Sequence, residues 1–172
     1  MLKDTVIYTQ RLVERPIEAV DFKVLYDNYD KDSEFYMDLF EAGNEEKVDE
    51  FIETCIKEIE EETDLHLIIN NRYTGEFIGY LGIYYLKEYE PEIGIWINGE
   101  SQNKGYGKEA VESAIRWIKD NYEFSHIKYP VDKDNIFSRK IPEYFNGKIK
   151  KEYSMKNCLG RTLNIVEYWI MK

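Results

Sequence analysis

The loop from Gln102 to Gly107 is the part of this 172-residue sequence whose residue types and spacing most clearly suit a chemical task. It joins a run rich in β-branched and aromatic residues, 92–97, to a segment ending near Asn121 in which apolar residues recur at helical spacing. A loop with two glycines at a helix start leaves several backbone N–H groups unpaired at the positive end of the helix dipole. Such a loop suits a phosphate or pyrophosphate; the alternative is a connection whose glycines only ease a tight turn.

Three phosphate-loop patterns can be compared with this segment. The Walker A motif is excluded, because Lys108 is followed by Glu109 and not by serine or threonine. The dinucleotide fingerprint matches both glycines and Ala110, but it should directly follow the first strand of a βαβ unit. Here the loop lies past mid-chain, after strands that are predicted to form hairpins. The third pattern, Q/R-x-x-G-x-G/A, is matched by Gln102 and the two glycines.

With its flanks, the third match resembles the GNAT N-acetyltransferase superfamily, in the branch of the RimJ/RimL and spermidine acetyltransferases. The matching segments are 11–12 and 15–16 in the first strand, 92–97 before the loop, 131–135 with Ser138 after the next strand, and 166–170 in the closing strand. They follow one another in the family's order and extend over nearly the whole chain. The resemblance implies an acetyl-CoA-dependent N-acetyltransferase.

Composition limits the other classes of function. The formal net charge of −11 argues against general nucleic-acid binding, which needs a basic surface. The longest apolar stretch, 77–86, is broken by glycines and too short to span a bilayer, and the N-terminus has no secretory h-region. Two cysteines, Cys55 and Cys158, are most simply free thiols. We therefore expect a cytoplasmic protein with one domain over residues 1–172 and no membrane partner.

Hydrophobic periodicity predicts antiparallel hairpins around one strand–helix–strand crossover, which is a mixed α+β fold. The expected strands cover 5–13, 65–70, 76–86, 93–97, 125–131, 148–155 and 163–171. The expected helices cover 18–29, 45–62 with Asn44 as its cap, the segment from the loop to 121, and 136–145. The resemblance adds that the central sheet is mostly antiparallel, with two splayed parallel strands and flanking helices.

The resemblance also implies how a cofactor is held. Acetyl-CoA would lie in a V-shaped opening between the parallel strands 93–97 and 125–131, with its pyrophosphate on the amides of 104–108. The implied cofactor-binding residues are Ile95, Trp96 and Ile97 through their main chain, and Gln102, Asn103, Lys104, Gly105, Tyr106, Gly107, Lys108, Asn135, Ser138 and Lys140. Asn135 equally suits a helix cap, and Tyr106 suits packing on the sheet. The two histidines belong to no Cys/His cluster with metal-ligand spacing, so no metal is expected.

Acetylating an amine requires removal of a proton, because a primary alkylamine has a pKa of about 10.4 and arrives charged. Glu92 is the candidate general base, since it begins the cofactor-facing strand and matches the glutamate of the family's E-I-G-Y/F-W pattern. A glutamate that merely flanks a strand is the alternative. A backbone N–H of the same strand, such as that of Ile97, would bind the oxyanion.

The sequence departs from the family after Asn135. The position of the family's tyrosine, thought to protonate the departing thiolate, is occupied by Pro142, and Tyr144 is the nearest substitute acid. The alternative for Tyr144 is an aromatic that packs beside Phe145. An interior proline costs a helix about 3 kcal/mol, so we predict that this segment avoids one continuous helix through Pro142.

Two functions from different classes follow. The first is an N-acetyltransferase acting on a primary amine: a small amine, polyamine, antibiotic or protein N-terminus. The alternative is a non-catalytic acyl-CoA-binding or protein-interaction module that keeps the fold. The acidic stretch 41–64 is either the solvated face of a helix or a surface that attracts a cationic amine. The sequence does not name the acceptor, and homodimers are common in the family.

Overall fold

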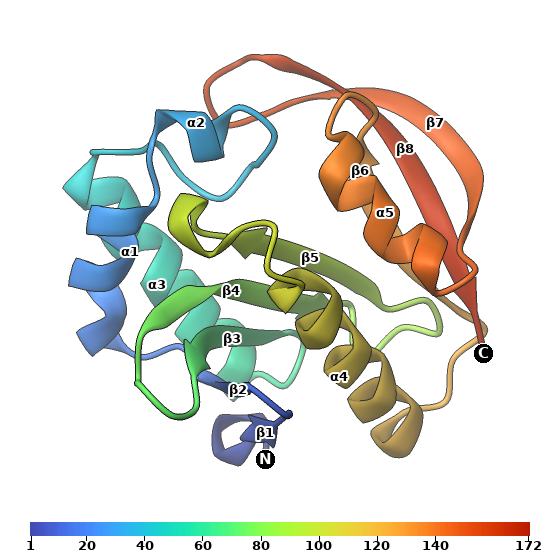
Figure 1. The fold of residues 1–172 in the computed structure, drawn as a ribbon, viewed down its shortest axis with the longest axis horizontal. Coiled ribbons are helices and arrows are strands. Elements are labelled where there is room, and N and C mark those ends of the chain that lie inside the picture. Colours follow the sequence, from blue (N-terminus) through green and yellow to red (C-terminus); the bar gives the residue numbers. More distant parts are fainter.

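The computed structural model describes residues 1–172 and contains one eight-stranded sheet (Figure 1). Its strand order is β1-β2-β3-β4-β5-β6-β8-β7, and every neighbouring pair is antiparallel except β5 and β6. The strands are β1 (Ile7–Tyr8), β2 (Leu12–Pro16), β3 (Leu65–Asn71), β4 (Phe77–Tyr84), β5 (Glu92–Ile97), β6 (His126–Asp132), β7 (Lys148–Lys156) and β8 (Thr162–Met171). The predicted mixed α+β fold with one parallel pair is confirmed.

Helices cover both faces of the sheet. They are α1 (Phe22–Asn28), α2 (Lys31–Glu34), α3 (Glu45–Glu60), α4 (Tyr106–Asn121) and α5 (Ile136–Tyr144). α1 and α3 lie behind the sheet in Figure 1, and α4 and α5 lie in front of it. Asn44 caps α3 as predicted, accepting a hydrogen bond from the Lys47 backbone N–H at 3.3 Å. None of these helices is long and apolar enough to cross a membrane.

The single strand predicted over 5–13 is wrong, because a turn at Thr9–Arg11 divides it into β1 and β2. The Thr9 side chain makes this turn. Its hydroxyl oxygen accepts a hydrogen bond from the Leu12 backbone N–H at 2.8 Å, while the Thr9 N–H donates to the Leu12 carbonyl at 3.0 Å. The turn projects toward the start of α4.

The parallel pair separates almost as soon as it forms. β5 and β6 share one bridge, Glu92 with Lys128, next to which the Lys128 N–H donates to the Pro91 carbonyl at 2.8 Å. Beyond that bridge, β5 pairs only with β4 and β6 only with β8. The carboxyl ends of β5 and β6 therefore diverge, and β5 has one edge without a strand partner (Figure 1).

The prediction that the segment after Asn135 avoids one continuous helix is wrong, because α5 runs unbroken through Pro142. The missing N–H removes one intrahelical bond, to the Ser138 carbonyl four residues earlier, and only the last turn of the helix follows the proline. That turn closes on the proline carbonyl, which accepts from the backbone N–H groups of Phe145 at 3.1 Å and Gly147 at 2.8 Å. Pro142 is also buried.

One buried carboxyl links α4 to the sheet. Glu14 of β2 is 0% exposed, and both of its oxygens lie 2.8 Å from the Ser113 hydroxyl, which is also 2.7 Å from the Ala110 carbonyl. A hydroxyl has one hydrogen, so all three groups are satisfied when Glu14 is protonated and donates to Ser113. Burial raises the pKa of Glu14 to about 8; the Ser113 hydrogen bond lowers it and the Glu109 charge raises it.

Candidate active site

The start of α4 offers free backbone donors. Gly105 precedes the helix in the left-handed conformation, at φ +81°, and no side chain caps the helix. The first intrahelical bond runs from the Glu109 N–H to the Gly105 carbonyl at 3.1 Å. The N–H groups of Tyr106, Gly107 and Lys108 therefore have no partner within the helix, at the end where its dipole is positive. This arrangement can bind an anion such as a pyrophosphate.

Successive residues of β5 direct their backbone N–H and C=O groups alternately toward β4 and toward the side of β6. The Asn98 N–H donates to the Ile78 carbonyl of the β4 segment at 2.9 Å, and residues two apart on a strand point the same way. Trp96 therefore turns its main chain toward β4, so it is not available to a ligand in the opening. Ile95 and Ile97 turn theirs toward the edge that has no strand partner. Of the three residues expected to pair with pantetheine, only these two have the required orientation.

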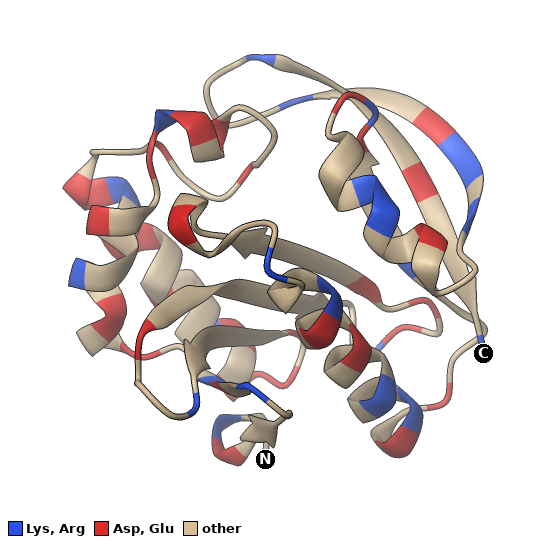
Figure 2. Cartoon of the chain, in the orientation of Figure 1, with Lys and Arg blue, Asp and Glu red and all other residues tan.

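The side chains predicted to bind cofactor lie around this edge, several of them with protein partners. Gln102 donates its side-chain amide to the Ile97 carbonyl at 3.0 Å. Asn135 caps α5 by accepting from the Ser138 N–H at 3.2 Å, and the Ser138 hydroxyl lies 2.8 Å from that of Tyr129. Asn103 (φ +60°), Lys104 and Lys140 are exposed. Basic segments lie in the loop before α4, in its first turn next to an acidic one, and in the middle of α5, whereas acidic segments are frequent on α3 (Figure 2).

Glu92 lies on the face of the sheet opposite α4. Gly107 at the start of α4 packs near Ile97, since a Cβ on this glycine would lie 3.6 Å from the Ile97 side chain. Successive side chains of a strand point to opposite faces, so Glu92, Gly94 and Trp96 point to the side of α1 and α3. A cofactor held at the start of α4 would thus approach from one face, and the carboxylate from the other.

The surroundings of Glu92 bring the pKa of its carboxyl close to neutral pH. Burial raises the pKa of the Glu92 carboxyl to about 7; the Lys128 ammonium lowers it, and the charges of Glu167 and Asp64 raise it. A general base is most effective when its pKa is close to the working pH. Lys128 on β6 and Glu167 on β8 were not recognised from the sequence, because only the pairing of these strands brings them near Glu92.

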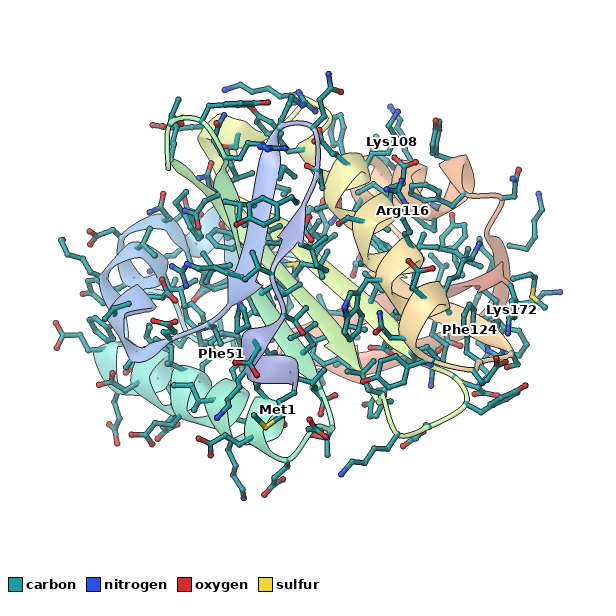
Figure 3. All side chains as sticks on the ribbon, turned by 90° about the horizontal axis from the view of Figure 1, so that it is seen from below. Met1, Phe51, Lys108, Arg116, Phe124 and Lys172 are labelled. Carbon is teal, nitrogen blue, oxygen red and sulfur yellow. The ribbon has the colours of Figure 1, made fainter.

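Tyr144 lies beside the start of α4. Its ring is the platform for Lys108, whose ammonium lies 4.1 Å from the ring centroid, and it also meets Phe145 edge-to-face at 5.1 Å. The tyrosine is 61% exposed. Lys108 projects from the first turn of α4 toward solvent (Figure 3). Tyr144 therefore lies against Lys108 in the first turn of α4. Pro142, which occupies the position of the tyrosine in the family's pattern, is buried and has no O–H.

Comparison with solved structures shows the same fold. An acetyltransferase (GNAT family) from Bacillus anthracis has a TM-score of 0.82 and 19% identity over 97% of this chain and 98% of its own. RimL, the ribosomal L7/L12 alpha-N-protein acetyltransferase, has a TM-score of 0.85 and 12% identity over 98% and 94%. Ribosomal-protein-S5-alanine acetyltransferase from Vibrio fischeri has a TM-score of 0.79 and 13% identity over 98% and 97%.

Sequence comparison identifies the family. No curated protein matches the chain significantly. The family model described as Acetyltransferase (GNAT) domain matches residues 11–145, which include β5, the loop at 102–107 and α5. Its span and the shared fold lead to one conclusion: the chain belongs to the GNAT acetyltransferase family.

Proposed function

We propose that this GNAT acetyltransferase holds acetyl-CoA between β5 and β6 and transfers the acetyl group to a primary amine. The observation that carries the proposal is the single bridge between these strands, which leaves the Ile95 main chain and the Ile97 N–H without a strand partner beside the unpaired amides of α4. Pantetheine contains two amides that match such a strand edge. The pyrophosphate would lie on the amides of 104–108, near the ammonium groups of Lys104 and Lys108.

Glu92 would serve as the general base. It takes one proton from the ammonium form of the acceptor, either directly or through water, so that the nitrogen lone pair attacks the thioester carbonyl. A backbone N–H on the free edge of β5, from Ile95 or Ile97, would bind the oxyanion. The attack forms the C–N bond; as the C–S bond breaks, the nitrogen gives up its second proton and the departing thiolate takes one up, which leaves a neutral amide and a thiol. Because Glu92 faces the side of α1 and α3, the acceptor would approach from that side.

A protein N-terminal amine is the first acceptor to test, because two structural neighbours are named as ribosomal-protein acetyltransferases. The decisive assay follows thiol release from acetyl-CoA with peptides, polyamines, aminoglycosides and amino acids as acceptors. An acceptor-dependent release, with mass spectrometry showing one added acetyl group, supports the proposal. Binding of acetyl-CoA with no release for any acceptor would support the binding module instead, a function favoured by the buried Pro142 at the position of the family's acid.

Replacing Gly105 with valine should abolish coenzyme A binding while the protein stays folded. A β-branched residue is strongly disfavoured at φ +81°, so the loop must change its conformation and its amides lose their common direction. Calorimetry with coenzyme A measures the affinity, and circular dichroism checks the fold. Gly43→Val is a matched control, because Gly43 has φ +76° in a turn before α3. An unchanged affinity in Gly105→Val would place the phosphate site elsewhere.

Replacing Tyr144 with phenylalanine should change turnover less than about threefold, because its ring, which holds Lys108, is retained and only the hydroxyl is lost. Steady-state rates with the best acceptor of the panel measure this effect. Tyr144→Ala, which removes the ring, should instead raise KM for acetyl-CoA. A loss of turnover of about 100-fold in Tyr144→Phe would assign the tyrosine as the acid that protonates the thiolate.

A further inference from the structure

Arg11 lies in the turn between β1 and β2, yet its side chain reaches the phosphate loop. We propose that Arg11 is a positioning residue that fixes the loop in its binding conformation, an inference that rests on the proposed pyrophosphate site. Its Nη1 donates to the Lys104 carbonyl at 2.9 Å, and its Nε donates to the Glu109 carboxylate at 2.7 Å. The guanidinium also lies over the Tyr106 ring, with 4.4 Å from Cζ to the centroid.

These contacts enclose the residue at which the loop turns. Lys104, Tyr106 and Glu109 flank Gly105, and a Cβ on this glycine would lie 3.4 Å from Arg11 Nη2. A peptide carbonyl and the following N–H point in opposite directions. The bond to the Lys104 carbonyl therefore fixes the plane of the 104–105 peptide and the direction of its N–H. Without this bond, a flexible glycine loop would have to become ordered when the ligand binds, at a cost in conformational entropy.

Arg11 also neutralises the carboxylate nearest to the proposed pyrophosphate. Glu109 is in the first turn of α4, where it would repel an anion bound at the helix start. It accepts from the Thr9 hydroxyl at 2.6 Å, the Arg11 backbone N–H at 2.8 Å and Arg11 Nε at 2.7 Å. Burial alone raises the pKa of Glu109, but these bonds outweigh it and lower the pKa overall. The carboxylate is thus ionised and directed toward the β1–β2 turn.

The turn that carries Arg11 is itself held in place. The Arg72 N–H donates to the Arg11 carbonyl at 2.9 Å, and the Tyr73 hydroxyl donates to the Gln10 carbonyl at 3.1 Å. Arg72 also lies over the rings of Tyr8 and Tyr73. The β3–β4 turn therefore supports the β1–β2 turn, which in turn supports the phosphate loop. Such support is what a loop requires to keep its binding geometry before the ligand arrives.

The test compares Arg11→Gln with a matched control, Arg15→Gln. Arg15 lies on β2, the strand that follows this turn, and makes a two-nitrogen salt bridge to Asp21, which is 4% exposed, at 2.6 Å and 2.9 Å and away from the loop. Arg11→Gln should weaken coenzyme A binding about tenfold in calorimetry, with little change in the melting temperature. Arg15→Gln should lower the melting temperature and leave coenzyme A affinity nearly unchanged, because it leaves the buried Asp21 carboxylate without its cation.

The kinetic signature should agree with the affinities. In Arg11→Gln, KM for acetyl-CoA should rise while kcat stays within about twofold, and Arg11→Lys should recover only part of the affinity, because an ammonium cannot make the forked contact. Coenzyme A affinity in Arg11→Gln equal to that of the wild type would overturn the proposal. Failure of the wild type to bind coenzyme A would refute the proposed function instead, so the two failures are distinguishable.

Discussion

Glu92→Gln is expected to lower the turnover number by about 100-fold or more while the affinity for coenzyme A stays close to that of the wild type. A general base acts in the transition state, so its loss reduces kcat without removing a contact to the cofactor. Wild-type activity should rise with pH through about 7, because Glu92 must be ionised to accept a proton. The variant should lack this inflection, and its deficit should shrink at high pH as free amine becomes abundant.

Thiol-release kinetics between pH 6 and 9 would measure both effects. Glu88→Gln is the matched control, since it removes the same charge from the exposed turn just before β5. Its turnover should equal that of the wild type. Turnover near the wild-type value in Glu92→Gln at neutral pH would exclude Glu92 as the base.

Glu14→Gln is expected to stabilise the protein by a few kcal/mol at pH 8 and by only about 1 kcal/mol at pH 5. The folded-state pKa of Glu14, about 8, lies above that of an unfolded glutamate, about 4.3. Between these values the unfolded chain releases a proton that the folded chain keeps, so stability falls as pH rises, by on the order of 1 kcal/mol per pH unit. Glutamine keeps the shape and can donate to Ser113, but it cannot ionise.

Denaturant unfolding at several pH values measures the difference. The wild-type free energy of unfolding should decline from pH 5 to pH 8 more steeply than that of Glu14→Gln. Parallel curves for the two proteins would mean that Glu14 is already ionised in the folded state. The same measurement on Glu76→Gln, an exposed position before β4, should reproduce the wild-type curve.

The elements that carry local signals could be predicted from the sequence. The apolar spacing of α3 and α4, the Asn44 cap and the glycines at the phosphate loop each depend on neighbouring residues, and the structure has them within a few residues of the expected bounds. The broken first strand depends on the Thr9 side chain, and the unbroken α5 ends in backbone hydrogen bonds to the Pro142 carbonyl. Periodicity contains neither kind of information.

The candidate site could be predicted only in part from the sequence, for a related reason. Glu92 and the loop are adjacent in sequence to recognisable patterns, whereas their supporting residues come from distant strands. Arg11 reaches the loop from the β1–β2 turn, and Lys128 and Glu167 approach Glu92 through strand pairing. Tyr144 was considered as an acid by counting along the chain, but counting does not give the direction of its side chain, which the structure places against Lys108.

Because β5 and β6 share only one bridge, a ligand bound between them would add to the thermodynamic stability of the folded protein. Pantetheine amides on Ile95 and Ile97 would supply hydrogen bonds that a ninth strand would otherwise provide. A ligand bound only by the folded state stabilises it by RT ln(1 + [L]/Kd), which is about 2.7 kcal/mol at 100 times Kd. If acetyl-CoA binds there, resistance of the protein to proteolysis would rise with the concentration of acetyl-CoA, because proteases act on the unfolded chain.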